Sequence, residues 1–232
     1  MAVKLSQIAY DHILAAIVEG RLPVGDTVSE NALAEELSIS RSPVREAIGR
    51  LQAEGLVRQI PRYGTVVRFP EREELRELFE LREALECFAV EKACAKATPE
   101  DIEALAALVD RIREIAYELR AGEHSVLGDD LLQDFLDTDQ TFHMRIIRIA
   151  GNRRIMKSVR ESRVLAGIFG RPRQEHDLAV VARTYRRHAQ VLRAIEKGDS
   201  ASARARTSAH IQSSCRKALM HHDRKRLEMS LL

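Results

Sequence analysis

The sequence has no tryptophan and few aromatic residues of any kind. Aromatic side chains make up 4% of its 232 residues. Alanine, leucine, arginine and glutamate dominate instead, and this composition is typical of a helical protein. A chain of this length holds one large domain or two modest ones.

Long apolar runs and paired cysteines are also missing. No run approaches the apolar length of a membrane-spanning helix, and the N-terminus lacks the apolar core of a signal peptide. The three cysteines, Cys87, Cys94 and Cys215, have no CxxC spacing, and such an odd, sparse set fits a reducing cytoplasm better than a disulfide scaffold. We therefore expect a cytoplasmic protein with no membrane partner.

A large net charge is absent too, because 37 basic residues face 35 acidic ones and the formal net charge is +2. One stretch nevertheless concentrates positive charge. Between Arg41 and Arg68, six arginines stand against two glutamates, a local excess of four. Positive charge in this chain is localised, which marks the stretch as a candidate binding surface.

Residues 29–64 have the pattern of a short helix, a turn and a longer helix. Ser29 can cap the first helix, where apolar residues keep helical spacing. The second helix begins near Ser40 or Ser42, and Pro43 suits its first turn. Its predicted inward stripe consists of Val44, Ala47, Ile48 and Leu51.

A hairpin follows this pair of helices. Gly55 ends the second helix, and Leu56–Ile60 and Thr65–Phe69 are predicted strands about a basic turn. The order of elements predicts a winged helix-turn-helix, which presents the start of its second helix to base edges in DNA. Arginine suits this role because its planar fork pairs with guanine or phosphate. An ordinary three-helix unit with solvated arginines is the alternative, and the order of the features favours DNA binding.

At these residues the sequence resembles the GntR family of bacterial transcription regulators. The most specific match is Arg41-Ser42-Pro43-Val44-Arg45-Glu46-Ala47. The resemblance implies DNA contacts from Asn31, Ser40, Arg41, Ser42, Pro43, Arg45 and the wing tip near Gly64, and the local charge adds Arg50 and Arg62. Position 31 departs from the arginine or glutamate common in relatives, so its contact, to base or phosphate, stays open. Since one such unit reads few base pairs, we expect a homodimer on a pseudo-palindromic double-stranded operator.

Pro70 marks the predicted boundary between a DNA-binding domain, residues 1–69, and a helical domain, residues 70–232. The second domain shows six periodic blocks, namely Glu71–Lys96, Pro99–Ala121, Asp129–Ala150, Arg153–Phe169, Leu178–Lys197 and Ser200–Met220. Short connections between the blocks imply an antiparallel bundle. The predicted fold class is mainly α, with an N-terminal winged helix-turn-helix and a C-terminal antiparallel all-α bundle.

Polar residues of metal-ligand type occur on helix faces of this second domain. Asp139 and His143 are four residues apart and point the same way. His188 lies at the centre of an apolar stripe, whereas periodicity places His210 on a more polar side. One carboxylate and three imidazoles would together bind a divalent transition metal, with zinc the leading candidate and nickel or manganese as alternatives. For any single histidine, a satisfied core residue is the ordinary alternative.

The second domain resembles the FCD ligand-binding domain of the FadR subfamily. Asp139-x-x-Phe142-His143, the motif beginning at His188, and His210 match its metal motifs. The resemblance implies that Asp139, His143, His188 and His210 hold the ion. Arg82, near the apolar side of its helix, either forms a salt bridge with Glu86 or binds an effector carboxylate, as the resemblance modestly favours.

Together these features predict a ligand-responsive transcription regulator, in the form of a repressor, rather than an enzyme. Its helical domain is expected to sense a small organic acid and to alter operator binding. Two alternatives stay open. One is a metal-dependent enzyme that uses the Asp/His cluster, although no second carboxylate or nucleophile is placed with it. The other is a metal-free sensor of acyl ligands, which the four ligand-type residues disfavour.

Overall fold

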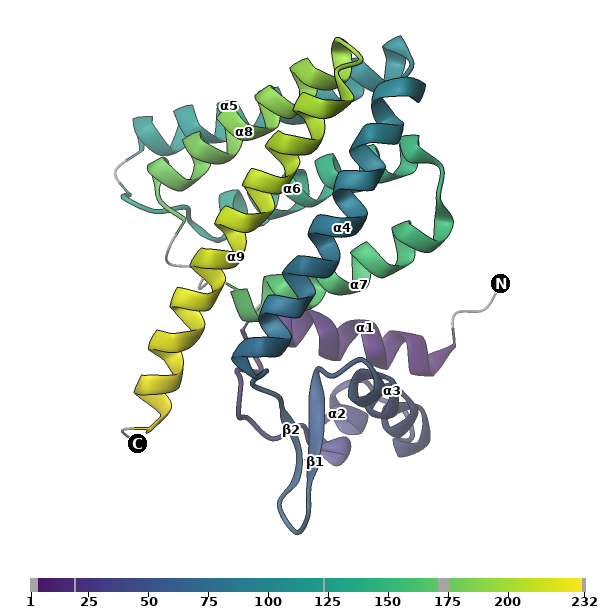
Figure 1. Cartoon of the computed structure of the whole chain (residues 1–232). Helices are drawn as coiled ribbons and strands as arrows, with labels where there is room; N and C mark the ends of the chain where they lie inside the picture. The colour runs from purple at the N-terminus through teal and green to yellow at the C-terminus, as the bar shows by residue number, and fades with distance from the viewer. Residues whose placement is uncertain (1–3, 19, 123, 171–175, 231–232) are drawn as a thin grey trace. The chain divides into compact units, whose positions relative to one another are not determined.

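The computed structural model describes residues 4–18, 20–122, 124–170 and 176–230. The chain divides into two compact units, Met1–Glu71 and Arg72–Leu232. The fold is mainly α with one small two-stranded sheet, as the sequence predicted (Figure 1). Within the described part of the chain, every helix is too short or too polar to cross a membrane.

The first unit is a winged helix-turn-helix. Its elements are α1 (Leu5–Val18), α2 (Glu30–Glu36), α3 (Arg41–Ala53), β1 (Val57–Ile60) and β2 (Gly64–Val67). The two strands are antiparallel, with Val57 opposite Val67 and Ile60 opposite Gly64. Helix α3 packs on α1, on α2 and on strand β1 of the wing. The helices and the wing therefore share one small core.

Local sequence signals account for these helices. The Ser29 side chain accepts a hydrogen bond from the Ala32 amide at 3.3 Å and so caps α2. Ser40 is the N-cap residue of α3 by backbone conformation, without a side-chain cap. The predicted inward stripe of α3 is buried, and its members are Val44, Ala47, Ile48 and Leu51. The residues left at the start of α3 therefore face outward.

The wing turn needs unusual backbone angles. Arg62 has a φ of 66° and Gly64 a φ of 111°, and the second value belongs to a region that glycine adopts readily. The strands differ slightly from the prediction, because β1 begins at Val57 and β2 runs from Gly64 only to Val67. Gly64 is therefore already paired with Ile60 in the sheet, at the end of the turn.

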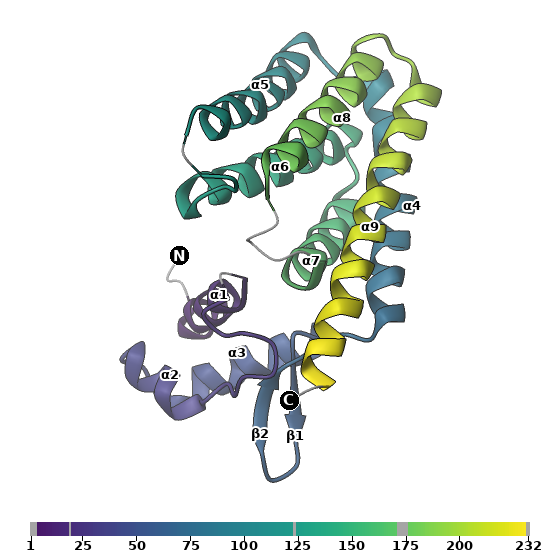
Figure 2. The ribbon, with the colours of Figure 1, turned by 90° about the vertical axis from the view of Figure 1, so that its left-hand side faces the viewer.

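The second unit is an all-helical bundle. Its helices are α4 (Arg72–Lys96), α5 (Pro99–Ala121), α6 (Asp129–Ala150), α7 (Arg153–Gly170), α8 (Leu178–Glu196) and α9 (Ser200–Ser230). Helix α4 runs beside α9, and α5 beside α8, in both views of the ribbon (Figure 2). The predicted blocks match these helices closely, and the exception is the last one.

Helix α9 continues ten residues beyond the predicted end at Met220. The sequence beyond Met220 is basic and has little apolar periodicity, so the predicted helix ended too early. Packing explains the extension, because Leu219 and His222 are buried. In addition, Arg72 of α4 donates to Asp223 at 3.0 Å. Contacts with α4 thus support a helical end that local sequence does not announce.

Apolar residues between α5, α6 and α8 form much of the bundle core. Phe142, Ile146 and Leu192 belong to its largest part, and Phe135 and Val181 to a neighbouring cluster. Thr98 and Asp101 form a capping box at the start of α5, which fixes where that helix begins. These helices, with α4 and α9, hold the polar cluster described next.

Candidate metal centre and DNA-binding surface

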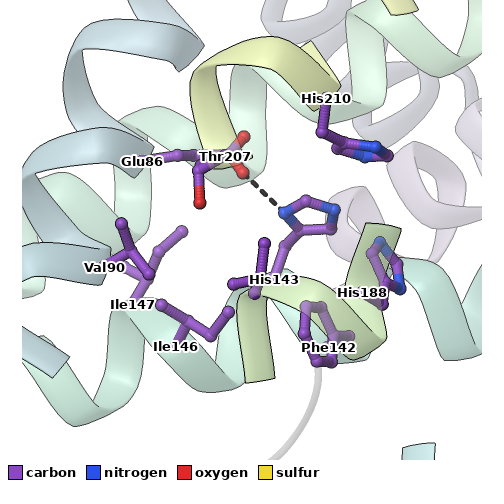
Figure 3. Close-up of a pocket in the computed structure, with 10 residues that line it drawn as sticks. Glu86, Val90, Phe142, His143, Ile146, Ile147, His188, Thr207 and His210 are labelled. Carbon is purple, nitrogen blue, oxygen red and sulfur yellow. Dashed lines mark ion pairs between the residues drawn. The ribbon is translucent and has the colours of Figure 1, made fainter. Parts of the chain in front are cut away.

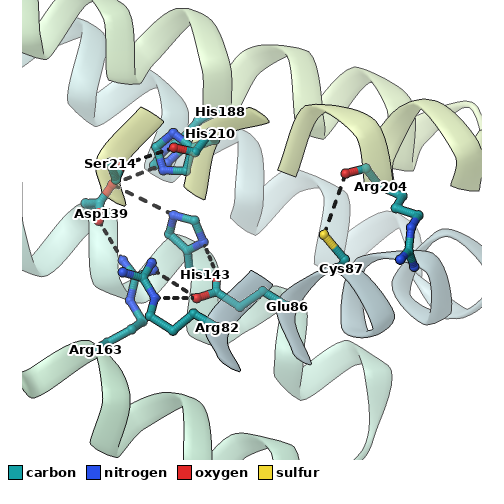
Figure 4. Close-up of polar contacts among 10 residues, drawn as sticks. All are labelled: Arg82, Glu86, Cys87, Asp139, His143, Arg163, His188, Arg204, His210 and Ser214. Atoms are coloured by element: carbon teal, nitrogen blue, oxygen red, sulfur yellow. Dashed lines mark hydrogen bonds and ion pairs between the residues drawn. The ribbon is translucent and has the colours of Figure 1, made fainter. Parts of the chain in front are cut away.

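Four ligand-type side chains converge inside the bundle. Asp139 and His143 come from α6, His188 from α8 and His210 from α9. One ligand atom of each lies within 4.8 Å of the ligand atoms of the others. The four-residue spacing on α6 placed its two members on one side, as expected. The structure also brings in His210, whose position the periodicity left uncertain (Figure 4).

The three imidazoles form a compact triangle. Their ring centroids are 5.0 Å apart for His143 and His188, and 5.2 Å apart for each pair that includes His210. Phe142 stacks on His188 with a centroid distance of 4.2 Å, which limits rotation of that ring. Packing against Phe142 therefore helps to position the ring nitrogens of His188.

Several buried nitrogens of this triangle lack hydrogen-bond partners among the described residues. They are Nε2 of His143, both ring nitrogens of His188 and Nδ1 of His210. Asp139 Oδ1 lies 3.3 Å from His188 Nε2, but no well-aligned hydrogen bond joins them. Buried polar atoms without partners are costly and rare, which points to a further group at this place. A carboxylate and three imidazoles are a suitable donor set for a divalent transition metal.

Asp139 and His143 are each held from behind by a second charged residue. Arg163 of α7 donates to Asp139 Oδ2 at 2.7 Å, which leaves Oδ1 toward the imidazoles. Glu86 Oε2 lies 2.7 Å from Nδ1 of His143, without a well-aligned hydrogen bond, and Nε2 is left toward the centre (Figure 3). Such outer contacts fix ligand orientation in metal sites. Arg163 was not among the predicted site residues, although its position four residues after buried Val159 places it on the inner face of α7.

Arg82 belongs to the same network. Its Nε donates to Glu86 Oε1 at 2.9 Å, and Arg163 Nη1 is 3.5 Å from the same oxygen. Arg82 is buried and is not among the residues that line the cavity beside the cluster. The structure thus contains the salt bridge between Arg82 and Glu86, which is one of the two roles predicted for Arg82. Contact between Arg82 and an effector stays a prediction.

Electrostatics keep Asp139, His188 and His210 in the forms that bind metals. Burial lowers the pKa of His188 to about 3, and burial also lowers the pKa of His210 well below its usual value. Burial alone would raise the pKa of Asp139, but the nearby Arg163 guanidinium lowers it. Neutral imidazoles and an ionised carboxylate are the forms that coordinate a cation.

A small cavity adjoins the cluster. Its volume of about 10 Å³ is enough for one water-sized group. Half of its ten lining residues are apolar, including Val90, Ile146 and Val191, and the polar half consists of Glu86, Thr207 and the three histidines. The hydroxyl of Thr207 is buried without a hydrogen-bond partner in the described structure. The cavity therefore places several polar groups beside an apolar wall, with room for one water-sized group.

The predicted DNA-binding residues lie mainly at the start of α3. Arg41, Ser42 and Arg45 are exposed there, as are Ser40 before the helix and Asn31 on α2. Pro43 is half-buried in the first turn. Arg41 and Arg45 both contact the carboxylate of Glu30. The structure thus gathers most of the predicted set on one exposed edge, and their contacts with DNA stay predictions.

Arg50 and the wing residues are placed differently. The Arg50 guanidinium lies 4.0 Å from the centre of the Tyr10 ring and donates to Gln7 at 2.9 Å. Both partners belong to α1, so Arg50 has a packing role that the local charge count did not reveal. Arg62 is exposed and Gly64 is half-buried at the far end of the hairpin. A wing contact therefore stays possible for Arg62 through its side chain.

A winged helix-turn-helix followed by a helical bundle with a buried polar site defines the class of DNA-binding transcription regulators. Residues 5–67 match the family described as bacterial regulatory proteins, gntR family, and residues 77–213 match the FCD domain. The chain belongs to the GntR family and carries an FCD domain, as the sequence motifs predicted.

Relatives of this chain are transcription regulators. The gluconate operon transcriptional repressor of Bacillus subtilis (strain 168) is 30% identical over 177 residues, which cover 74% of this chain and 68% of that protein. The Nta operon transcriptional regulator of Aminobacter aminovorans is 35% identical over 136 residues, and the match covers 59% of either protein. The chain is accordingly a regulator and not an enzyme.

Solved structures share the fold. E. coli McbR/YncC has a TM-score of 0.77 at 19% identity, covering 95% of this chain and all 100% of that chain. A GntR regulator from Rhodococcus sp. RHA1 has a TM-score of 0.70 at 21% identity, covering 92% and 97%. At these identities, the likeness concerns architecture alone.

Proposed function

We propose that this protein is a metal-containing repressor whose operator binding responds to a small carboxylate metabolite. The observation that carries the proposal is the buried cluster of Asp139, His143, His188 and His210, with its partnerless imidazole nitrogens. Such a cluster has no role in DNA contact, since it lies inside the helical unit. A regulator with a separate internal binding site has the two sites that linkage requires.

Within this proposal, Asp139, His143, His188 and His210 hold a divalent transition metal. Zinc is the leading candidate, with nickel and manganese as alternatives, because imidazole suits zinc and nickel and the carboxylate extends the choice toward manganese. When bound, such a cation supplies a Lewis-acid centre for an oxygen ligand. Arg163 holds Oδ2 of Asp139, and Glu86 holds Nδ1 of His143, so both ligands are oriented before binding.

One oxygen of the effector is proposed to occupy the water-sized cavity beside the cluster. Thr207 is a suitable hydrogen-bond donor to a carboxylate or hydroxyl oxygen there, because its buried hydroxyl has no partner in the described structure. The name of the gluconate operon repressor among the relatives supports both the repressor role and an organic acid. For Arg82, the salt bridge with Glu86 favours a supporting role, and direct effector contact is the alternative.

The output of the proposed switch is the DNA-binding unit, taken as residues 1–69, with residues 70–232 as the sensing unit. A homodimer on a pseudo-palindromic operator follows from the few base pairs that one winged unit can read. An effector alters operator affinity only by its differential affinity for the two dimer geometries. The cytoplasm is the compartment in which such a regulator meets DNA.

Metal content tests the input half of this proposal. We expect roughly one equivalent of metal per chain in the purified protein and essentially none in a His188→Ala/His210→Ala variant, because each substitution removes one of four ligands. Elemental analysis measures both. His124→Ala is the matched control, since this histidine is exposed and outside the cluster.

An unchanged metal content in the double variant would refute the site. The metal-free acyl sensor makes the opposite prediction, namely no stoichiometric metal in either protein. Retention of metal by the control and loss by the double variant separates these outcomes.

A further inference from the structure

One carboxylate contacts both arginines at the front of the helix-turn-helix. Arg45 Nη2 donates to Glu30 Oε2 at 3.0 Å, and its Nε lies 3.3 Å from each Glu30 oxygen. Arg41 Nη2 is 3.5 Å from the same Oε2. Glu30 begins α2 while the two arginines lie in the first turns of α3, so the contacts join the two helices of the motif.

A contribution to folding stability does not explain why Glu30, Arg41 and Arg45 are clustered. The side chains of Arg45 and Arg41 are 65% and 59% exposed, and that of Glu30 is 27% exposed. Exposed ion pairs contribute little to stability. A contribution to sequence-independent DNA affinity does not explain the presence of Glu30 either, because a carboxylate on this edge repels phosphates. A role in discrimination between DNA sequences remains.

The geometry suits such a role. Glu30 faces the Nε–Nη2 edge of Arg45, and the end of the guanidinium that carries Nη1 is left for a second acceptor. A bidentate pair with guanine uses two N–H groups of that planar fork. A guanidinium already fixed in its plane loses less conformational freedom when it pairs with a base. The hydrogen bond from Arg45 also lowers the pKa of Glu30, which keeps the carboxylate ionised.

We propose that Glu30 is a specificity-determining positioning residue of the DNA-binding surface. It orients Arg45, and more loosely Arg41, for base contact, and its charge weakens binding to DNA that offers phosphates alone. The inference rests on the proposed DNA-contact role of Arg41 and Arg45.

The test compares Glu30→Gln, Glu30→Asp and a control, Glu35→Gln, in the full-length protein. Glu35 is an exposed residue of the same helix, so its replacement changes the net charge equally. The probes are a duplex selected from random sequences by the unmodified protein and a scrambled duplex of the same length. Fluorescence anisotropy over a salt series gives both affinities, and thermal melting checks that each variant is folded.

The expected result is a loss of discrimination without a general loss of binding. For Glu30→Gln, the ratio of selected to scrambled affinity falls about fivefold or more, the lower end for one bidentate base contact. Affinity for the scrambled duplex rises about threefold, with a steeper salt dependence. Glu30→Asp keeps the negative charge but has a shorter side chain that no longer reaches Arg45. The ratio of selected to scrambled affinity therefore falls, while the affinity for the scrambled duplex is unchanged. Glu35→Gln keeps the wild-type ratio.

Two results would overturn the role of Glu30. One is a wild-type ratio in both Glu30 variants. The other is that Glu30→Gln and Glu35→Gln raise the affinities for the selected and the scrambled duplex by the same factor. This result would mean that the carboxylate acts through net charge alone. Arg45→Ala, measured alongside, distinguishes the failures. If Arg45→Ala lowers the ratio and the Glu30 variants do not, only the present inference fails, whereas a wild-type ratio for Arg45→Ala removes the DNA-contact role as well.

Discussion

The two charged clusters of this protein combine similar groups in opposite surroundings. On the first unit, Glu30 joins Arg41 and Arg45 on an exposed edge. In the second, Glu86 and Asp139 join Arg82, Arg163 and the imidazoles within a buried network. Water screens the first cluster and reaches the second only at Asp139, whose side chain is 24% exposed, so the same type of ion pair contributes differently in each.

The difference separates recognition from structural support. If Arg41 and Arg45 contact DNA as proposed, they exchange an internal partner for DNA with little change in folding free energy. The buried groups have no such freedom, because each one that loses its partner becomes an uncompensated charge. We therefore expect substitutions in the first cluster to change binding, and substitutions in the second to change folding and metal content.

The largest expected effect follows from Glu86→Ala. This change leaves Arg82 and Arg163 buried without a shared partner and should lower the free energy of unfolding by ~3–5 kcal/mol. Denaturant titration measures the loss. Glu91→Gln is the control on the same helix, because Glu91 forms an exposed pair with Arg204 and its loss should cost less than ~1 kcal/mol. Equal losses in the two variants would contradict the contrast between the clusters.

A smaller effect is expected at the exposed cluster. Arg41→Ala and Arg45→Ala should each reduce discrimination against a substituted base pair by ~1–3 kcal/mol, because a bidentate base contact is lost. Binding to a set of singly substituted duplexes measures this discrimination. Arg113→Ala removes an exposed arginine of the second unit that pairs with Asp110, and it should leave base preference unchanged. Intact base preference in both recognition-helix variants would mean that α3 does not read the operator as proposed.

The smallest effect concerns Arg50, which the local charge count grouped with the DNA-binding arginines. Its guanidinium stacks on Tyr10, so Arg50→Ala should lower the free energy of unfolding by about 1 kcal/mol. Base preference should not change. Denaturant titration and the same substituted duplexes check the two parts. A loss of base preference like that of Arg45→Ala would place Arg50 among the reading residues after all.

Sequence alone predicted most of the architecture because its signals were local. Ser29 and the Thr98 capping box mark helix starts, and the stripe of α3 has regular spacing. The end of α9 was beyond such reasoning, because the pair between Arg72 and Asp223 depends on a helix distant in sequence. Local patterns predict elements well, and they predict poorly where tertiary contacts extend an element.

The same distinction applies to the cluster. Asp139 and His143 share a helix face, so their proximity follows from spacing alone. His210 lies on a helix with weak apolar periodicity, and only the family resemblance joined it to the others. Arg163, and the contact between Glu86 and His143, require the packing of α7 and α4 against α6. Residues that support the cluster are harder to predict than the ligand-type residues themselves, because their contacts join different helices.

The most direct test of the account is whether a small carboxylate acts on operator binding through the buried cluster. The experiment measures affinity for the selected duplex, with and without each member of a panel of small mono- and dicarboxylates. It compares the metal-loaded protein with the His188→Ala/His210→Ala variant. We predict that at least one carboxylate weakens binding by the unmodified protein about tenfold, a coupling common in allosteric proteins, and does not affect the variant. No response from the unmodified protein, or an equal response from both, would contradict the account.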